Sequence, residues 1–361
     1  MTIERLKPVE TIERVLISST SRFVAEYEAD GVVITHVWPG FSAPGGFLRM
    51  KEGPLSRSAY MLSFVVPEVL RLPGQTIPNY EGTGDMVCSL LSLLFGKRFD
   101  SHGSVESHGD FRLPRLEQFN SLCIPALPQN NHNPRSDIVV PLDLRQVVRI
   151  WPLLTPEPSD AVKVAVLKGA AKFYHQALQN AEHDAEVAYL HLITAGEILT
   201  NTHMPESLEY LDKDLLEILD QVKAKVTNGE AAAKLLANRM RQIKRRFCLT
   251  IEDLIDDQFL STANGTADRL SFRKDDFARR IAAAYDIRSR YVHTGISFGA
   301  WIAPQSGNVS EEVRYGMPSL EDSDFAKTLQ WAPTYVGLER VIRYCLLKFA
   351  EKHKLFVEAE T

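Results

Sequence analysis

Two side chains with chemistry suited to RNA cleavage, Arg288 and His293, lie five residues apart. An imidazole can remove the proton from an RNA 2′-hydroxyl or protonate the leaving oxygen. A guanidinium can hold the phosphate through two parallel hydrogen bonds and stabilise its growing charge. Because the 2′-hydroxyl is itself the nucleophile in this reaction, neither a metal ion nor a cofactor is required.

The pair is expected at the end of a helix. Gly295 is a typical helix stop, which places His293 in the last turn, where the helix dipole favours an imidazolium. Five residues correspond to about 140° around a helix, so Arg288 and His293 do not share a face. They converge on one phosphate only if a partner helix or a second copy faces them. The spacing alone is a weak signal, since an Arg and a His this far apart also occur by chance.

Glu197 is the candidate for orienting this pair. It lies in an otherwise apolar stretch, where a carboxylate is costly unless it is paired. Glu197 either orients Arg288 or His293, or forms a structural ion pair with another basic residue such as Arg343. His191, six residues before Glu197, is expected to be an ordinary core or surface histidine.

Basic residues elsewhere in the same half of the chain are candidates for contact with the RNA backbone. The densest basic run consists of Arg239, Arg241, Lys244, Arg245 and Arg246. We expect RNA contacts from Arg241, Lys244 and Arg245 in this run, and from Arg290 beside the pair. The alternative for each of them is a solvated basic surface, partly neutralised by acidic residues between 252 and 257.

The segment 100–110 contains the side-chain types that hold zinc or manganese. Two histidines and three carboxylates occur in its eleven residues. The composition is equally typical of an exposed polar loop, so we predict no metal site there. The chain has neither a phosphate-loop pattern nor a Gly-x-Ser-x-Gly nucleophile elbow.

The elements that would position these residues fall into two parts. Residues 1–156 are rich in Pro and Gly, and short runs between these residues favour strands at 31–38, 59–66 and 138–140 and a helix at 85–95. Three prolines between 152 and 158 mark a stiff linker. Apolar spacings of three and four then predict helices at about 162–178, 184–200, 211–226, 230–247, 251–259, 277–293 and 334–352.

Length and composition agree with this division. A chain of 361 residues suggests two domains, which we place at 1–156 and 159–353. The expected fold class is α+β, with a mostly-β N-terminal domain followed by an all-α bundle. The net charge of −5 argues against a protein coated with nucleic acid, so any RNA contact is expected to be local. Scattered cysteines, the absence of an apolar leader and the absence of a long apolar run favour a cytoplasmic protein.

The C-terminal half resembles the HEPN superfamily, and within it the ApeA-like branch of prokaryotic defence proteins. One similar segment is residues 285–295, whose Arg288, Ser289 and His293 fit the family's Arg-x4–6-His signature with a polar residue after the Arg. The other is residues 188–199, where Glu197 precedes an apolar pair. The resemblance spans about residues 159–353 and leaves the first 156 residues unassigned. Ser289 departs from the Asn, Asp or His that is more frequent in the family.

The resemblance implies a helical bundle that forms a homodimer, with the Arg/His pairs meeting in a cleft at the interface. It implies metal-independent RNA cleavage that leaves a 2′,3′-cyclic phosphate, in phage defence or a toxin–antitoxin system. Arg288 would then be the phosphate clamp and His293 the general acid and base. The N-terminal domain is expected either to sense a trigger or to hold the catalytic domain in check, with an antitoxin or a trigger protein as its partner. The alternative is a catalytically inactive module that binds RNA or a protein partner.

Overall fold

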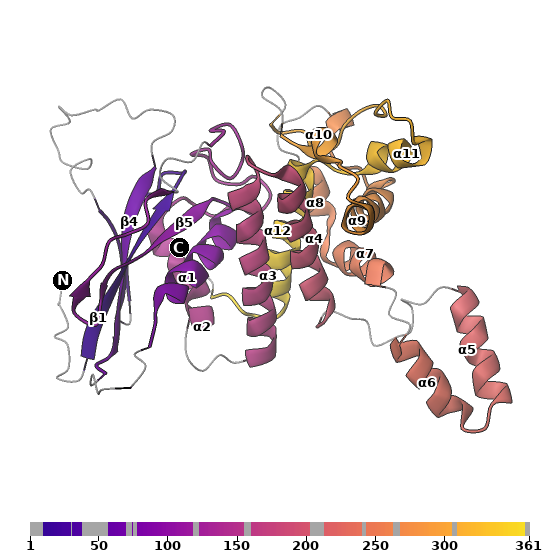
Figure 1. Cartoon of the computed structure of the whole chain (residues 1–361), viewed down its shortest axis with the longest axis horizontal. Coiled ribbons are helices and arrows are strands. Elements are labelled where there is room, and N and C mark those ends of the chain that lie inside the picture. The colour runs from indigo at the N-terminus through magenta and orange to yellow at the C-terminus, as the bar shows by residue number, and fades with distance from the viewer. Residues whose placement is uncertain are drawn as a thin grey trace.

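Figure 1 shows the computed structural model of the chain. The structure describes residues 10–29, 31–37, 57–69, 74, 78–117, 123–154, 160–202, 213–239, 243–262, 268–304 and 309–357. Within these residues an antiparallel sheet of six strands is followed by a stack of helices. The expected α+β class is therefore confirmed, while assignment of the helices to a HEPN-like bundle stays a prediction.

The sheet has the strand order β2-β3-β4-β1-β5-β6. The strands are β1 (Glu10–Ser19), β2 (Tyr27–Ala29), β3 (Val32–His36), β4 (Ser58–Pro67), β5 (Phe99–Ser107) and β6 (Asp110–Phe111). β1 is central, since Val15 lies opposite Leu62 of β4 on one side and Ser104 of β5 on the other. The predicted strands at 31–38 and 59–66 correspond to β3 and β4, although Trp38 lies outside the described residues.

Helix α1 (Glu81–Phe95) lies between the sheet and α3 (Ala161–Asn180), as Figure 1 shows. Gly84 allows the helix to approach the sheet, because a Cβ at this position would stand 2.6 Å from a methyl group of Val15. The helix ends at Gly96, whose φ of +63° is the left-handed conformation that glycine adopts freely. The predicted helix at 85–95 is confirmed and begins four residues earlier.

The helical part surrounds α12 (Tyr335–Lys352), which is buried along almost its whole length. The helices that follow the sheet, apart from α3 and α12, are α2 (Trp151–Leu154), α4 (Ala185–Thr200), α5 (Lys213–Lys225), α6 (Gly229–Arg239), α7 (Ile243–Leu254), α8 (Asp257–Ser261), α9 (Phe277–Thr294), α10 (Gly299–Ile302) and α11 (Ser323–Trp331). A 3-10 helix, Leu144–Ile150, precedes α2. The predicted helices at 184–200, 277–293 and 334–352 match α4, α9 and α12 to within one residue.

Several boundaries differ from the prediction. The helix expected at 230–247 is two helices, α6 and α7, on either side of residues 240–242, which lie outside the described residues. The helix expected at 251–259 is divided between the end of α7 and α8, where the carboxylate of Asp256 accepts a hydrogen bond from the Phe259 amide and caps a new helix. The segment 138–140 is irregular and forms no strand, so that prediction was wrong.

One hydrophobic core joins the sheet part to the helical part, with buried residues from Val15 in β1 to Leu355 after α12. Ion pairs cross the same junction. Arg135 donates two hydrogen bonds to Glu339 of α12, with nitrogen–oxygen distances of 2.9 and 2.6 Å, and Tyr174 of α3 donates a third. The two parts of the chain therefore pack together through buried surfaces. The predicted linker at 152–158 begins within α2, and residues 155–159 lie outside the described residues.

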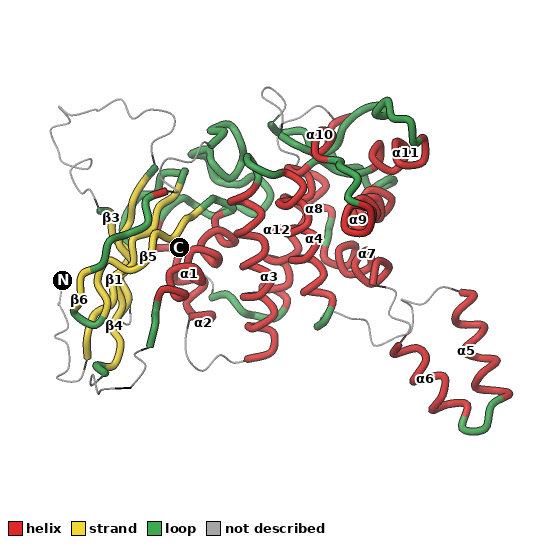
Figure 2. The backbone as a smooth tube through the Cα atoms, viewed as in Figure 1, coloured by secondary structure: helices red, strands yellow, loops and turns green. Residues whose placement is uncertain are grey.

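Helices α5 and α6 form a hairpin that stands away from the other helices (Figure 2). Its own small cluster is centred on Leu219 and Ala233, with Leu249 of α7 packed against it. Ile218, Val226 and Leu235 are exposed apolar residues of this hairpin. None of the described helices is long and apolar enough to cross a membrane.

Candidate active site

The proposed catalytic residues Arg288 and Glu197 are in contact where α9 packs against α4. Nη2 of Arg288 lies 3.2 Å from Oε2 of Glu197. The Tyr285 hydroxyl donates to the other carboxylate oxygen over 2.8 Å. Both carboxylate oxygens are thus engaged, and the arginine is held in one orientation at the surface of the bundle.

Tyr285 completes this group and was not assigned a role from the sequence. It precedes Arg288 by three residues, so the two side chains lie on one face of α9, and the guanidinium carbon stands 5.6 Å from the centre of the phenol ring. Burial, together with the hydrogen bond to Glu197, raises the pKa of Tyr285 above its usual value. The phenol therefore stays protonated and acts as a donor. The i, i+3 spacing in the sequence was the signal that could have identified it.

Arg343, the example given of a structural partner for Glu197, does not contact it. Arg343 is fully buried in α12, where its Nη1 donates to Asp137 over 2.9 Å. Its other nitrogens donate to the backbone carbonyls of Leu93 and Leu94 at the end of α1. Arg343 therefore ties the two parts of the chain together and is not available to Glu197.

His293 occupies the last turn of α9 and is exposed. Gly295 ends the helix with φ of +69°, and its amide donates to the Tyr291 carbonyl over 2.8 Å. We find no hydrogen bond or ion pair of the His293 side chain with the residues that the structure describes. The imidazole thus faces solvent at the carboxyl end of α9.

Arg288 and His293 do not meet within one chain. Their separation of five residues on α9 amounts to about 7.5 Å along the axis and about 140° around it. Ser289 is half-buried between them, and among the described residues its hydroxyl has no hydrogen-bond partner. The structure therefore unites Arg288 with Glu197 and leaves His293 separate.

The predicted RNA-contacting residues are divided. Arg290 forms an ion pair with Asp322 and its guanidinium carbon lies 4.5 Å above the centre of the Phe325 ring, so it anchors the start of α11. Lys244 of α7 pairs with Asp286 of α9 at 2.7 Å. Arg245 is exposed on the first turn of α7, and Arg241 lies outside the described residues.

Cys248 lies on α7 beside this group and is partly buried. Burial, with the nearby carboxylate of Glu252, raises the pKa of its thiol to about 12. Such a thiol stays protonated near neutral pH, so Cys248 is a poor nucleophile. His191 packs against the ring of Phe173, with centroids 5.7 Å apart, which fits the expected role of an ordinary partly buried residue.

The segment 100–110 is not the exposed loop that its composition suggested. Most of it is strand β5, and its polar side chains are paired inside the protein. Asp100 accepts hydrogen bonds from Arg57, from Arg98 over 3.0 Å and from Gln179 over 2.8 Å. His102 contacts the Ser18 hydroxyl through Nε2 at 2.8 Å. Among the described residues no group of three or more potential metal ligands occurs, here or elsewhere.

Comparisons with family models, with curated proteins and with solved structures find no match to this chain.

Proposed function

We propose that the helical part is a metal-independent endoribonuclease that acts as a homodimer. Arg288 holds the scissile phosphate, and His293 removes the 2′-hydroxyl proton and returns a proton to the leaving oxygen. The observation that carries the proposal is the contrast on α9: Arg288 is fixed by Glu197, while His293 is exposed and has no partner among the described residues. The sequence resemblance places such an enzyme in prokaryotic defence or a toxin–antitoxin system.

The geometry of Arg288 is compatible with phosphate binding. Glu197 contacts only one terminal nitrogen of the guanidinium, and a quarter of the Arg288 side chain is exposed. A guanidinium has five N–H donors, so several are left for a phosphate. Fixing the side chain in advance lowers the entropic cost of binding and keeps the charge directed at the transition state.

The separation of Arg288 from His293 supports a site shared by two copies. If α9 of one copy faces α9 of another across a twofold axis, each Arg288 can approach the His293 of its partner. Val292 and Ile296 flank His293 and are 55% and 40% exposed, which provides apolar surface for self-association at this end of the helix. The exposed sheet part would then be free to bind a trigger protein or antitoxin.

A protein-interaction module is the second candidate, and the local ion pairs favour it. Arg290 and Lys244, two of the expected RNA contacts, are neutralised by Asp322 and Asp286. With these charges paired and Val292 exposed nearby, the same surface suits a protein partner. In that case Arg288 and His293 would only stabilise α9 and its packing, without binding RNA.

Cleavage of RNA in the presence of EDTA distinguishes the two candidates. We expect the wild-type protein to leave 2′,3′-cyclic phosphate ends, and His293→Ala to be slower by about 10²–10⁴-fold, the usual contribution of a general acid or base. Arg288→Ala is expected to be similarly impaired and Arg288→Lys to recover only in part, because lysine cannot bind a phosphate with two parallel donors.

The matched controls are His183→Ala, an exposed histidine in the turn before α4, and Arg273→Ala, an exposed arginine paired with Asp275. Both are expected to cleave like the wild type.

Mixing equal amounts of Arg288→Ala and His293→Ala tests the shared site. If each site uses residues from two copies, random exchange of subunits restores about a quarter of the sites. Inactivity of the wild type on total RNA, or equal activity of all variants, favours the interaction module.

A further inference from the structure

A cavity of about 530 Å³ lies between α1 and α3, outside the candidate active site. Its volume is within the range of small-molecule pockets, about 300–1,000 Å³. One stripe of each helix lines it: Asp85 and Ser89 are four residues apart on α1, and Lys168, Lys172 and Gln176 follow the same spacing on α3. Met86 and Leu90 of α1 also line it, so the cavity combines apolar walls with a few polar groups, as small-molecule sites do.

Within the described part of the chain the lysines of the cavity have no ion-pair partner, and Asp85 on the facing helix does not pair with them. Lys168 is half-buried, and burial lowers its pKa with no contribution from an acidic group. Neither Lys168 nor Lys172 forms an ion pair with the residues that the structure describes. By contrast, Lys163 on the first turn of the same helix pairs with Asp160 at 3.0 Å.

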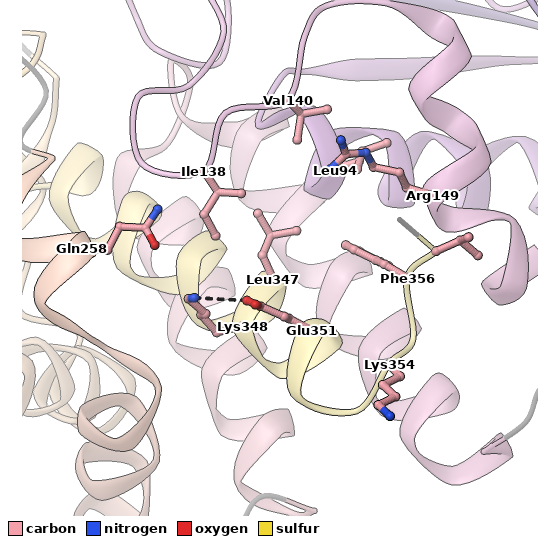
Figure 3. Close-up of a pocket in the computed structure, with 11 residues that line it drawn as sticks. Leu94, Ile138, Val140, Arg149, Gln258, Leu347, Lys348, Glu351, Lys354 and Phe356 are labelled. Carbon is pink, nitrogen blue, oxygen red and sulfur yellow. Dashed lines mark ion pairs between the residues drawn. The ribbon is translucent and has the colours of Figure 1, made fainter. Parts of the chain in front are cut away.

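A second cavity, of about 420 Å³ at the end of α12, contains a lysine whose charge is paired with carboxylates (Figure 3). There Lys348 pairs with Glu351 at 3.1 Å and with Asp256 at 3.3 Å. Lys348 is thus neutralised by two carboxylates, whereas Lys354, which lines the same cavity, forms no ion pair with the described residues. The missing partner of Lys168 and Lys172 points to an anion supplied from outside.

The floor of the cavity presents a hydrogen-bond acceptor. Ser89 and His175 both line it and are only 5% and 4% exposed. His175 has a pKa lowered by burial, and its Nε2 lies 2.5 Å from the Phe99 carbonyl, so Nε2 carries the proton and Nδ1 accepts. The Ser89 hydroxyl donates to the Asp85 carbonyl over 2.7 Å and lies 3.3 Å from Nδ1 of His175. One hydroxyl proton cannot serve both acceptors, which leaves capacity for a hydroxyl donor.

We propose that this cavity binds a small hydroxylated phosphate ester such as a sugar phosphate. Lys168 and Lys172 hold the phosphate, and a hydroxyl of the ligand donates to the acceptor formed by Ser89 and His175. Lys168 lies seven residues before His175 on α3, about 10 Å along the helix, and Lys172 lies three residues before it, so a ligand larger than inorganic phosphate is needed to contact both lysines and the acceptor together. Gln176 also lines the cavity, one residue beyond His175 on α3, and can offer its amide to the ligand. The ligand would bridge the sheet part and the helical part, because α1 and α3 belong to different parts.

Titration calorimetry of the full chain tests this site, with ribose 5-phosphate as the probe and with ribose and inorganic phosphate as comparators. We expect ribose 5-phosphate to bind at least about tenfold more tightly than either fragment. Lys168→Ala should weaken binding by about tenfold or more, the usual cost of losing a hydrogen bond to a charged group. Lys163→Ala, the matched control on α3, should bind like the wild type.

Pyridoxal 5′-phosphate provides a second readout that probes the two lysines directly. Its aldehyde condenses with a lysine amine to an imine and releases water, and borohydride then reduces the imine to a stable secondary amine. Mass spectrometry should show faster labelling of Lys168 and Lys172 than of Lys163, and ribose 5-phosphate should slow it. Any of three results would overturn the proposal. They are uniform labelling of the lysines without protection, binding of ribose 5-phosphate no tighter than that of phosphate, and unchanged affinity in Lys168→Ala.

Discussion

Two arginine–carboxylate pairs in this protein use the same chemistry in different surroundings. Arg135 and Glu339 lie at the junction of the two parts, with side chains 3% and 1% exposed and two short hydrogen bonds between them. Arg288 and Glu197 lie at the surface between α4 and α9, with side chains 25% and 20% exposed and one contact of 3.2 Å.

The difference shows that burial decides whether an ion pair serves the fold or keeps donors for a ligand. A buried pair costs a large desolvation free energy, which is offset only when most of its donors and acceptors are satisfied. Glu339 meets this condition, since Arg135 and Tyr174 donate three hydrogen bonds to it. A partly exposed pair contributes less to stability but keeps donors available, so it can exchange part of its bonding for a ligand.

The largest expected effect is on the buried pair. Glu339→Gln leaves Arg135 charged and without its counter-ion, so we expect the free energy of unfolding to fall by about 3–5 kcal/mol. Urea denaturation followed by circular dichroism measures this loss. Glu351→Gln is the matched control on the same helix, because its side chain is 70% exposed and pairs only with Lys348 among the described residues. A loss below about 1 kcal/mol in Glu339→Gln would remove the distinction between the two pairs.

The junction should also be sensitive to acid. Burial lowers the pKa of His175 below its usual 6.5, so below that pH the unfolded chain binds more protons than the folded one. Stability therefore falls as the pH drops below about 6.5, by at most about 1.4 kcal/mol per pH unit for one group. His175→Gln should flatten the dependence of unfolding free energy on pH between 7 and 5, whereas Gln176→Ala should leave it unchanged. An identical slope in wild type and His175→Gln would contradict the assignment.

Helices at the centre of the helical part could be predicted from the sequence because their signals are local. The apolar spacing of α4, the side chain of Asp184 that caps its first turn and the glycine at 295 that ends α9 are all visible in one sequence window. Because these signals place α9, the positions of Arg288 and His293 on that helix could also be predicted from the sequence. Glu197 was chosen for a similar local reason, as a carboxylate in an apolar stretch, but its partner required the packing of α4 on α9.

Non-local partners explain the errors. Strand β5 was missed because Asp100 and His102 are polar residues whose partners, such as Ser18 and Gln179, are about 80 residues away in the chain. The segment 138–140 has the composition of a strand, yet Ile138 and Val140 line a cavity beside α12 and pair with no strand among the described residues. Whether a β-branched run becomes a strand depends on a neighbouring strand, which a local pattern does not reveal.

The surface pair should respond in the opposite way to the buried one. Glu197→Gln removes the charge that orients Arg288 but retains a hydrogen-bond acceptor, so the free energy of unfolding should change by no more than about 1 kcal/mol. If Arg288 binds the phosphate, RNA cleavage should slow by up to about 10²-fold through kcat, because a misplaced clamp lowers transition-state stabilisation. Stability loss as large as that of Glu339→Gln would show that Glu197 is a structural residue. Unchanged cleavage would remove Glu197 from the site.

The smallest expected effect is on the exposed ion pair between Lys244 and Asp286, which differs from both arginine–carboxylate pairs. Lys244 and Asp286 are each nearly half exposed, so Lys244→Ala should change the free energy of unfolding by less than about 1 kcal/mol. If Lys244 exchanges Asp286 for an RNA phosphate, binding should weaken for all sequences and the slope of log affinity against log salt should fall by about one. Filter binding at several salt concentrations measures this slope. Lys327→Ala is the matched control, since Lys327 is an exposed lysine of α11 paired with Asp324 at 2.9 Å. An equal change in both variants would indicate a general effect of net charge, and it would leave the α7–α9 surface without a specific contact to RNA.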